Sequence, residues 1–203
     1  NQLCTDDFAG HLAHNCNLSV KAIMGIASFA ILCRMRGMEK DAAYWMEIAR
    51  SMAKTWERTA ANGDGTYRLA FDQPGTFSMK YNMLWDVLFG TGLFDKDMIN
   101  SEFSSYVSRH LNRYGMPLDN RADYTKSDWI LWCASVLENP AFFQKMVHPV
   151  WLCYHESPSR VPLTDWYDSK TAERVGFQNR TVQGGLFIKI LKDSKALDAS
   201  IQK

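Results

Sequence analysis

The sequence predicts an all-α fold built from stacked helical hairpins, and two observations carry this prediction. Segments that are apolar on nearly every side alternate along the chain with amphipathic segments. Links from an apolar segment to the next amphipathic one are short, whereas the returning links are long and polar. Because consecutive helices in such a stack run antiparallel, the long links should all meet at one end of the molecule.

The first predicted hairpin joins residues 18–33 to residues 39–58. The first segment carries one charge, Lys21, in more than four turns, so it is expected to be an inner helix that is covered on nearly all sides. The second segment is amphipathic and is expected to lie outside it. Its predicted buried stripe is Ala43, Met46, Ala49, Ala53 and Trp56.

Two further hairpins and one last helix follow in the same order. Residues 77–93 are largely apolar and predict an inner helix, and residues 96–113 predict an outer helix. Residues 128–137 predict the third inner helix. Pro140 opens its partner, because proline suits the first position of a helix, and Pro149 should kink or restart that helix. The last helix is expected from about 179 to 191 and has no outer partner after it.

The long links are residues 61–76, 114–127 and 156–178. In the first, Asn62-Gly-Asp-Gly is a strong turn signal, and residues 67–71 are compatible with a short strand. A calcium loop is the alternative interpretation of Asn62 and Asp64. A single carboxylate without a downstream Glu at the required spacing favours the turn.

We expect one domain over residues 1–203, forming the C-terminal half or so of an (α/α) toroid of six hairpins. Each hairpin in such a stack covers its neighbour, so the inner helices need further hairpins beside them. The chain begins at Asn1 without a start Met or a signal peptide, which also favours a piece of a larger protein. Upstream domains of that protein are therefore expected partners.

Charge and cysteine content exclude several classes of protein. The 23 basic and 22 acidic residues nearly cancel and form no basic run, so neither nucleic acid nor an anionic membrane is an expected partner. The longest apolar stretch, residues 22–33, is shorter than the roughly 20 residues of a membrane span. Five scattered cysteines without a Cys-x-x-Cys pair argue against a zinc cluster or a disulfide framework, and Cys33, Cys133 and Cys153 are expected in the core.

Carboxylates beside aromatic residues mark the end of the molecule where the long links meet. Aromatic faces stack on C–H surfaces and carboxylates bind hydroxyl or amine groups, which suits a pocket for a sugar or an amide. The predicted catalytic residues are Asp7, Asp128 and Asp165. Helix capping is the alternative for Asp7 and Asp128. The run from Thr164 to Asp168 is harder to explain by turn chemistry alone, and the predicted substrate-binding residues in these links include Asp119, Trp129, Trp166 and Asp168.

The first segment adds three polar candidates before the first inner helix: Asp6, His11 and Asn15. His11 and His14 are three residues apart with no third imidazole at a suitable spacing, so we expect no metal site. Nucleophile-elbow, phosphate-loop and dinucleotide motifs do not occur, and no cofactor is expected. Paired carboxylates acting as general acid and base remain the best chemical hypothesis, as in an inverting glycosidase.

Five ordered motifs resemble the C-terminal domain of the glutaminase A family. They are Cys4-Thr-Asp-Asp-Phe-Ala-Gly-His-Leu-Ala-His-Asn-Cys-Asn-Leu-Ser-Val-Lys-Ala, Lys80-Tyr-Asn-Met-Leu-Trp-Asp86, Tyr114-Gly-Met-Pro-Leu-Asp-Asn-Arg, Tyr124-Thr-Lys-Ser-Asp-Trp129 and Val161-Pro-Leu-Thr-Asp-Trp-Tyr-Asp168. The resemblance covers about residues 3–191. It implies a six-hairpin toroid behind β-rich domains in a secreted or periplasmic hydrolase that converts glutamine to glutamate and ammonia.

Three functions follow as hypotheses. In a glutaminase, a carboxylate would activate water while Arg121 and Lys126 hold the α-carboxylate of the substrate. A glycoside hydrolase of the six-hairpin class is the second, because the toroid is similar to that of glucoamylase-like enzymes and the acids stand beside aromatic residues. A carbohydrate-binding module without catalysis is the third.

Overall fold

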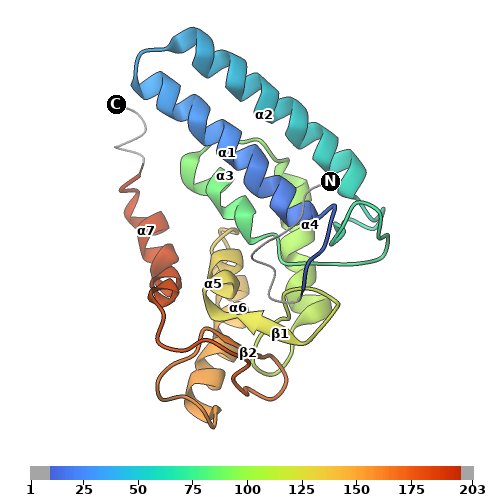
Figure 1. The fold of residues 1–203 in the computed structure, drawn as a ribbon, viewed down its shortest axis with the longest axis vertical. Coiled ribbons are helices and arrows are strands. Elements are labelled where there is room, and N and C mark those ends of the chain that lie inside the picture. The colour runs from blue at the N-terminus through green and yellow to red at the C-terminus, as the bar shows by residue number, and fades with distance from the viewer. Residues whose placement is uncertain (1–9, 198–203) are drawn as a thin grey trace.

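The computed structural model describes residues 10–197, and within them helices are the main regular structure, joined by long irregular links. Three antiparallel hairpins follow one another: α1 (Cys16–Met35) with α2 (Glu39–Ala60), α3 (Leu84–Phe89) with α4 (Lys96–Ser105), and α5 (Ser127–Ala134) with α6 (Pro140–Glu156). Figure 1 shows the hairpins stacked in chain order, with α7 (Ile188–Ser194) beside the third. The predicted fold class is confirmed.

The first hairpin forms as the sequence predicts. Asn15 caps α1, since its side chain accepts a hydrogen bond from the backbone N–H of Leu18. Trp56 ties the end of α2 to the start of α1 by donating its indole N–H to the Cys16 carbonyl at 2.8 Å. The buried stripe of α2 differs at one position, because Ala42 lies in the interface and Ala43 is exposed.

The second hairpin is shorter than predicted. Instead of one helix over residues 77–93, a 3-10 turn at Tyr81–Met83 leads into α3, which ends at Gly90 in a left-handed conformation. Residues 77–80 are irregular because they bind neighbouring links: the Phe77 N–H donates to the Asn120 side chain and the Met79 N–H to the Leu118 carbonyl. Its partner α4 changes into a π-helical turn, η2, at Tyr106–His110.

The third hairpin and the chain end bring two more corrections. Helix α6 begins at Pro140 as predicted, but it continues through Pro149 to Glu156 without a restart. The predicted last helix is instead a seven-residue 3-10 segment, η3 (Thr181–Phe187), followed by α7. Two glycines in η3, Gly184 and Gly185, weaken its preference for α-helix.

The long links meet at one end, as predicted, and carry a two-stranded antiparallel sheet of β1 (Tyr124–Lys126) and β2 (Trp166–Asp168). The predicted strand at residues 67–71 is wrong, since only isolated bridges form there, at Tyr67 and Ala70. The turn at residues 62–66 is confirmed: Asp64 accepts hydrogen bonds from the backbone and hydroxyl of Thr66.

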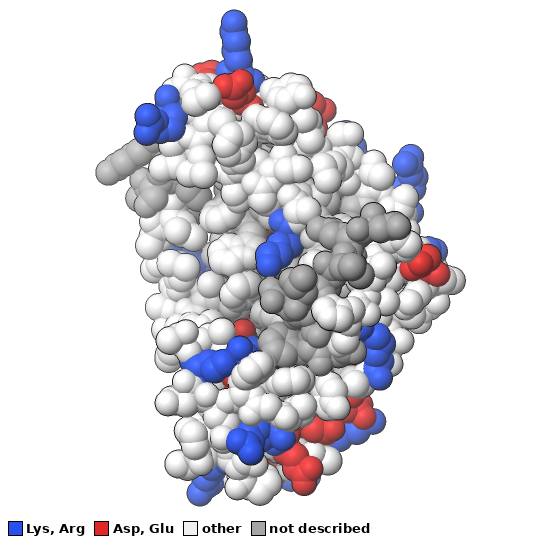
Figure 2. Space-filling view, viewed as in Figure 1, with Lys and Arg blue, Asp and Glu red and all other residues white. Residues whose placement is uncertain are grey.

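One face of α1 stays exposed within the described residues. Phe29, Leu32 and Met35 expose 48%, 56% and 48% of their surface, and Figure 2 shows a wide uncharged area on the face that carries α1. At 20 residues, α1 is long and apolar enough to cross a membrane, so the length argument made on residues 22–33 was wrong. Its other side packs in the main core through Val20, Ala27 and their neighbours, as in a core helix of a soluble protein.

Candidate functional site

Two cations and two carboxylates meet where α5 begins. Lys126, the last residue of β1, forms ion pairs with Asp165 and, at 3.1 Å, with Asp128. Arg180, the residue before η3, binds both oxygens of Asp165 from the other side. Lys126, Asp128 and Asp165 each expose less than a twentieth of their surface, so the cluster is desolvated and its charges interact strongly.

The two carboxylates differ in their environment. Burial raises the pKa of Asp165, but the hydrogen bonds from Arg180 and Lys126 outweigh it, and the net pKa lies below its ordinary value. Burial also raises the pKa of Asp128, and there the attraction of Lys126 only partly offsets it, so this pKa stays above its ordinary value. One carboxylate is thus held ionised while its neighbour retains a proton more readily, which is the arrangement that acid–base sites use.

Half-buried aromatic rings continue the cluster along α3 and α5. The Trp129 ring lies under the Lys126 ammonium, 5.1 Å from it, and stacks on Tyr81 with 4.1 Å between ring centroids. Trp132 packs edge-on against Tyr81 and Trp85 at 6.3 and 5.1 Å. The carboxyl of Asp128 therefore lies at one end of a row of aromatic rings, the aromatic wall, which consists of Tyr81, Trp85, Trp129 and Trp132.

Asp119 and Arg121 form a different pair. Arg121 binds both oxygens of Asp119, one through its side-chain Nε at 2.9 Å, and its Nη1 donates to the Gly10 carbonyl. Both residues line a surface hollow of about 320 Å³ together with Phe77 and His110, whose rings stack. Arg121 therefore lies in another group of polar residues than Lys126, with which the sequence analysis had placed it.

The other predicted site residues have mixed placements. Asn15 is a buried helix cap, and His11 is exposed. Asp168 accepts hydrogen bonds from the N–H groups of Lys170 and Thr171, so turn chemistry does explain it, against our expectation. The Trp166 ring packs against Phe177. Asp6 and Asp7 lie outside the described residues.

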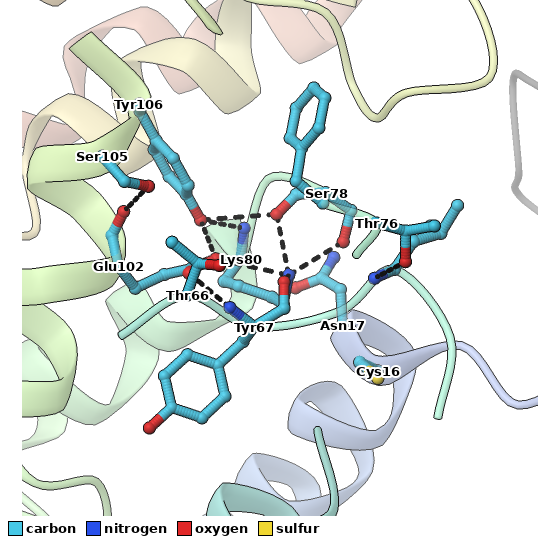
Figure 3. Close-up of polar contacts among 12 residues, drawn as sticks. Cys16, Asn17, Thr66, Tyr67, Thr76, Ser78, Lys80, Glu102, Ser105 and Tyr106 are labelled. Carbon is cyan, nitrogen blue, oxygen red and sulfur yellow. Dashed lines mark hydrogen bonds and ion pairs between the residues drawn. The ribbon is translucent and has the colours of Figure 1, made fainter. Parts of the chain in front are cut away.

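Two charged residues with several partners in the structure, Arg180 and Glu102, were not predicted from the sequence. Arg180 has no motif around it, and only its position at the start of the last predicted helix could have pointed to it. Glu102 lies on a helix whose sequence is mostly polar, yet only 1% of its surface is exposed. Figure 3 shows its carboxylate beside Lys80 and Tyr106, which point toward it.

The network around Glu102 joins the first two hairpins. The Lys80 ammonium lies 3.4 Å from the carboxylate and donates to the carbonyls of Tyr67 and Ser78. Glu102 also accepts from the Tyr67 N–H at 2.9 Å and from the Tyr106 hydroxyl at 3.0 Å. Every partner is satisfied inside the protein and the network is sealed, which favours a structural role.

The described part of the chain contains no group of three His, Cys, Asp or Glu side chains placed to hold a metal ion. Its four described cysteines, Cys16, Cys33, Cys133 and Cys153, are buried and free. Burial raises the pKa of the Cys133 thiol well above its ordinary value, so it behaves as a small core residue and not as a nucleophile.

Comparison with known proteins gives a consistent family. The glutaminase A six helical-hairpin domain matches residues 1–190. Glutaminase A of Aspergillus oryzae is 32% identical over 196 residues, which cover 92% of this chain and 28% of that protein. A probable glutaminase of Arthroderma benhamiae is 30% identical over 220 residues, with 92% and 25% covered. The chain thus spans about a quarter of the length of these relatives.

Proposed function

Because this chain belongs to the glutaminase A six-hairpin family, we propose that it forms part of the active site of a glutaminase-type hydrolase. The observation that carries the proposal is the pair of unlike carboxylates at the start of α5, one ionised and one with a raised pKa. The names of the two fungal relatives, a glutaminase A and a probable glutaminase, support glutamine as the substrate.

In the proposed reaction, Asp128 is the proton donor. Hydrolysis of a carboxamide requires attack of water on the carbonyl carbon and a proton for the nitrogen that leaves as ammonia. The Asp128 carboxylate that remains after donation takes up the proton that the water loses, which restores the acid. A buried carboxyl with a raised pKa supplies that proton near neutral pH better than an exposed one does.

Lys126 and Asp165 are proposed as positioning residues. Lys126 contacts both carboxylates, so it fixes the distance between them and holds Asp128 in one rotamer. Asp165 is fully buried and binds two cations, and its carbonyl also accepts the Ser127 N–H at 3.0 Å. Asp165 is therefore proposed to hold Lys126 and the start of α5 in position, instead of the catalytic role predicted from the sequence.

A glycoside hydrolase is the second candidate, and the aromatic wall favours it. Trp129 and Tyr81 present stacked, half-buried rings next to Asp128. Sugar rings bind to such faces through their C–H groups, and a protonated carboxyl beside them is the proton donor of a glycosidase.

An assay of the full-length protein that contains this chain separates the two candidates. Ammonia release from glutamine and reducing-end release from a panel of oligosaccharides are measured side by side on the same preparation. Ammonia release with every oligosaccharide intact is the expected result. Cleavage of an oligosaccharide with glutamine untouched would replace the glutaminase proposal by the glycosidase one.

A further inference from the structure

The segment η3 lies directly over the proposed proton donor. A Cβ atom built on Gly185 would stand 2.9 Å from Asp128 Cβ and 3.0 Å from Trp132 Nε1, closer than real Cβ atoms come. The backbone of η3 therefore covers the side chain of Asp128, which is only 4% exposed. A substrate cannot reach the carboxyl past η3 while the segment stays in this position.

The same segment packs on α5 but contributes no fully buried residue to the core. Seven residues of 3-10 helix is long for this conformation, whose hydrogen bonds are poorly aligned. None of its residues is buried, and Phe187 at its end exposes 63% of its surface. Few buried apolar contacts are what distinguishes segments that open locally.

Two polar anchors fix η3 in this position. Arg180, just before the segment, forms the ion pair with Asp165. The side-chain Oε1 of Gln183 accepts a hydrogen bond from the Tyr154 hydroxyl at 3.0 Å. Both anchors connect η3 to residues that pack around the start of α5, so movement of η3 is coupled to the proposed site.

Two buried N–H donors near the contact between η3 and α5 have no hydrogen-bond partner among the described residues, namely Trp132 Nε1 of α5 and Gln183 Nε2 of η3 itself. A buried donor without an acceptor is unfavourable, because it has lost its hydrogen bonds to water. Both atoms are donors, so the group that would satisfy them is an acceptor oxygen, such as the carbonyl of a carboxamide.

We propose that η3 is a lid, which opens to admit a small substrate to Asp128 and closes over it with Trp132 and Gln183 as donors to a substrate oxygen. This inference rests on the proposed function for the identity of the substrate. The opening itself is a property of the fold and is tested separately.

Hydrogen exchange of the full-length protein tests the lid through a matched pair of variants. Neither Gly184 nor Gly185 has a positive φ, so alanine is compatible with the backbone at both positions, but only Gly185 contacts Asp128 and Trp132. Gly185→Ala should lift η3 and speed exchange of its amides about tenfold or more, with α5 unchanged, while Gly184→Ala leaves exchange within about twofold of the wild type. Arg180→Met, which removes one anchor, should act like Gly185→Ala and serves as the second variant if that one does not fold.

The substrate arm uses Asp128→Asn, which should bind glutamine without turnover. Saturating glutamine should slow exchange in η3 and leave α2 unchanged. Amides of η3 that exchange as slowly as those of α5 in the wild type, and that respond to neither Arg180→Met nor glutamine, would overturn the lid. If the full-length protein does not hydrolyse glutamine, the proposed function fails, while the exchange rates of the wild type, Gly185→Ala and Gly184→Ala still decide whether η3 opens.

Discussion

Asp128 and Asp165 show how neighbouring side chains of the same type acquire different properties. Burial is the largest influence on both pKa values; at Asp165 the hydrogen bonds from Arg180 and Lys126 outweigh it, whereas at Asp128 the attraction of Lys126 does not. Both acids were predicted to be catalytic because aromatic residues stand beside them. Their different environments could not be predicted from the sequence, because Arg180, which binds Asp165, lies 15 residues after it in the chain.

If Asp128 is the proton donor as proposed, its raised pKa should set the pH dependence of the reaction. Asp128 donates only when protonated, so kcat should fall as pH rises through this pKa, and the fall should lie above the ordinary range of an Asp carboxyl. Removing the Lys126 cation raises that pKa further, so Lys126→Met should move the fall to higher pH. The pH profile of kcat measures both, with Asp41→Asn on α2 as the control that leaves the profile unchanged. If kcat of Lys126→Met fell at the same pH as kcat of the wild type, Lys126 would not belong to the site.

Lys80 is predicted to be a stability residue. Lys80→Met leaves the buried Glu102 without a cation, which should lower the free energy of unfolding by about 3–5 kcal/mol. Lys54→Met on the exposed face of α2 is the matched control and should change it by at most about 0.5 kcal/mol. Urea unfolding measures both. Adding Glu102→Leu to Lys80→Met should recover part of the lost free energy of unfolding. If Lys80→Met and Lys54→Met lowered that free energy equally, the ion pair between Lys80 and Glu102 would contribute nothing.

Helix boundaries followed local signals that the sequence displays. Pro140 and the alternation of apolar segments located the hairpins, whereas residues 77–80 and η3 depend on contacts with distant links and were predicted as helix. Helix propensity is a weak preference that tertiary contacts override. The same limit explains Glu102, which a helical pattern places on a polar face although Lys80 and Tyr106 bury it.

The cap of α1 gives a prediction for a single helix. Asn15→Ala removes the acceptor for the Leu18 N–H and should cost about 1 kcal/mol of unfolding free energy. Asn15→Ser keeps an acceptor at the same position and should retain most of the unfolding free energy that the cap contributes. Thermal unfolding compares the two variants. If both lose activity with unchanged stability, Asn15 binds substrate as the sequence analysis proposed.

The turn at residues 62–66 should loosen in acid. Hydrogen bonds from Thr66 and Arg109 lower the pKa of Asp64 to about 2 from 3.8. Because the folded-state pKa is depressed, this contribution to stability is complete above about pH 4 and disappears as pH falls toward 2. The stability difference between the wild type and Asp64→Asn should shrink over this range in unfolding experiments. A constant difference from pH 5 to pH 2 would exclude the titration of Asp64 as its cause.

For the molecule as a whole, hairpin order and loop asymmetry were enough to predict that the long links gather at one end, where the proposed site lies. The long links do gather, and the bonds between them include the Ser169 N–H to the Asp123 carbonyl and the Ser127 N–H to the Asp165 carbonyl. The groups of residues that lie together at that end were predicted only in part. Lys126, Asp128 and Trp129 do come together, while Asp119 and Arg121 form their own pair.

The most direct test replaces one oxygen. Asp128→Asn in the full-length protein removes the proton donor and nearly preserves the shape of the side chain, so hydrolysis of glutamine should fall about 10²–10⁴-fold in kcat. Asp41→Asn on α2 makes the same chemical change away from the site and should keep wild-type activity, and equal thermal unfolding of the two variants excludes misfolding as the cause. Wild-type turnover in Asp128→Asn would show that the catalytic carboxyl lies elsewhere.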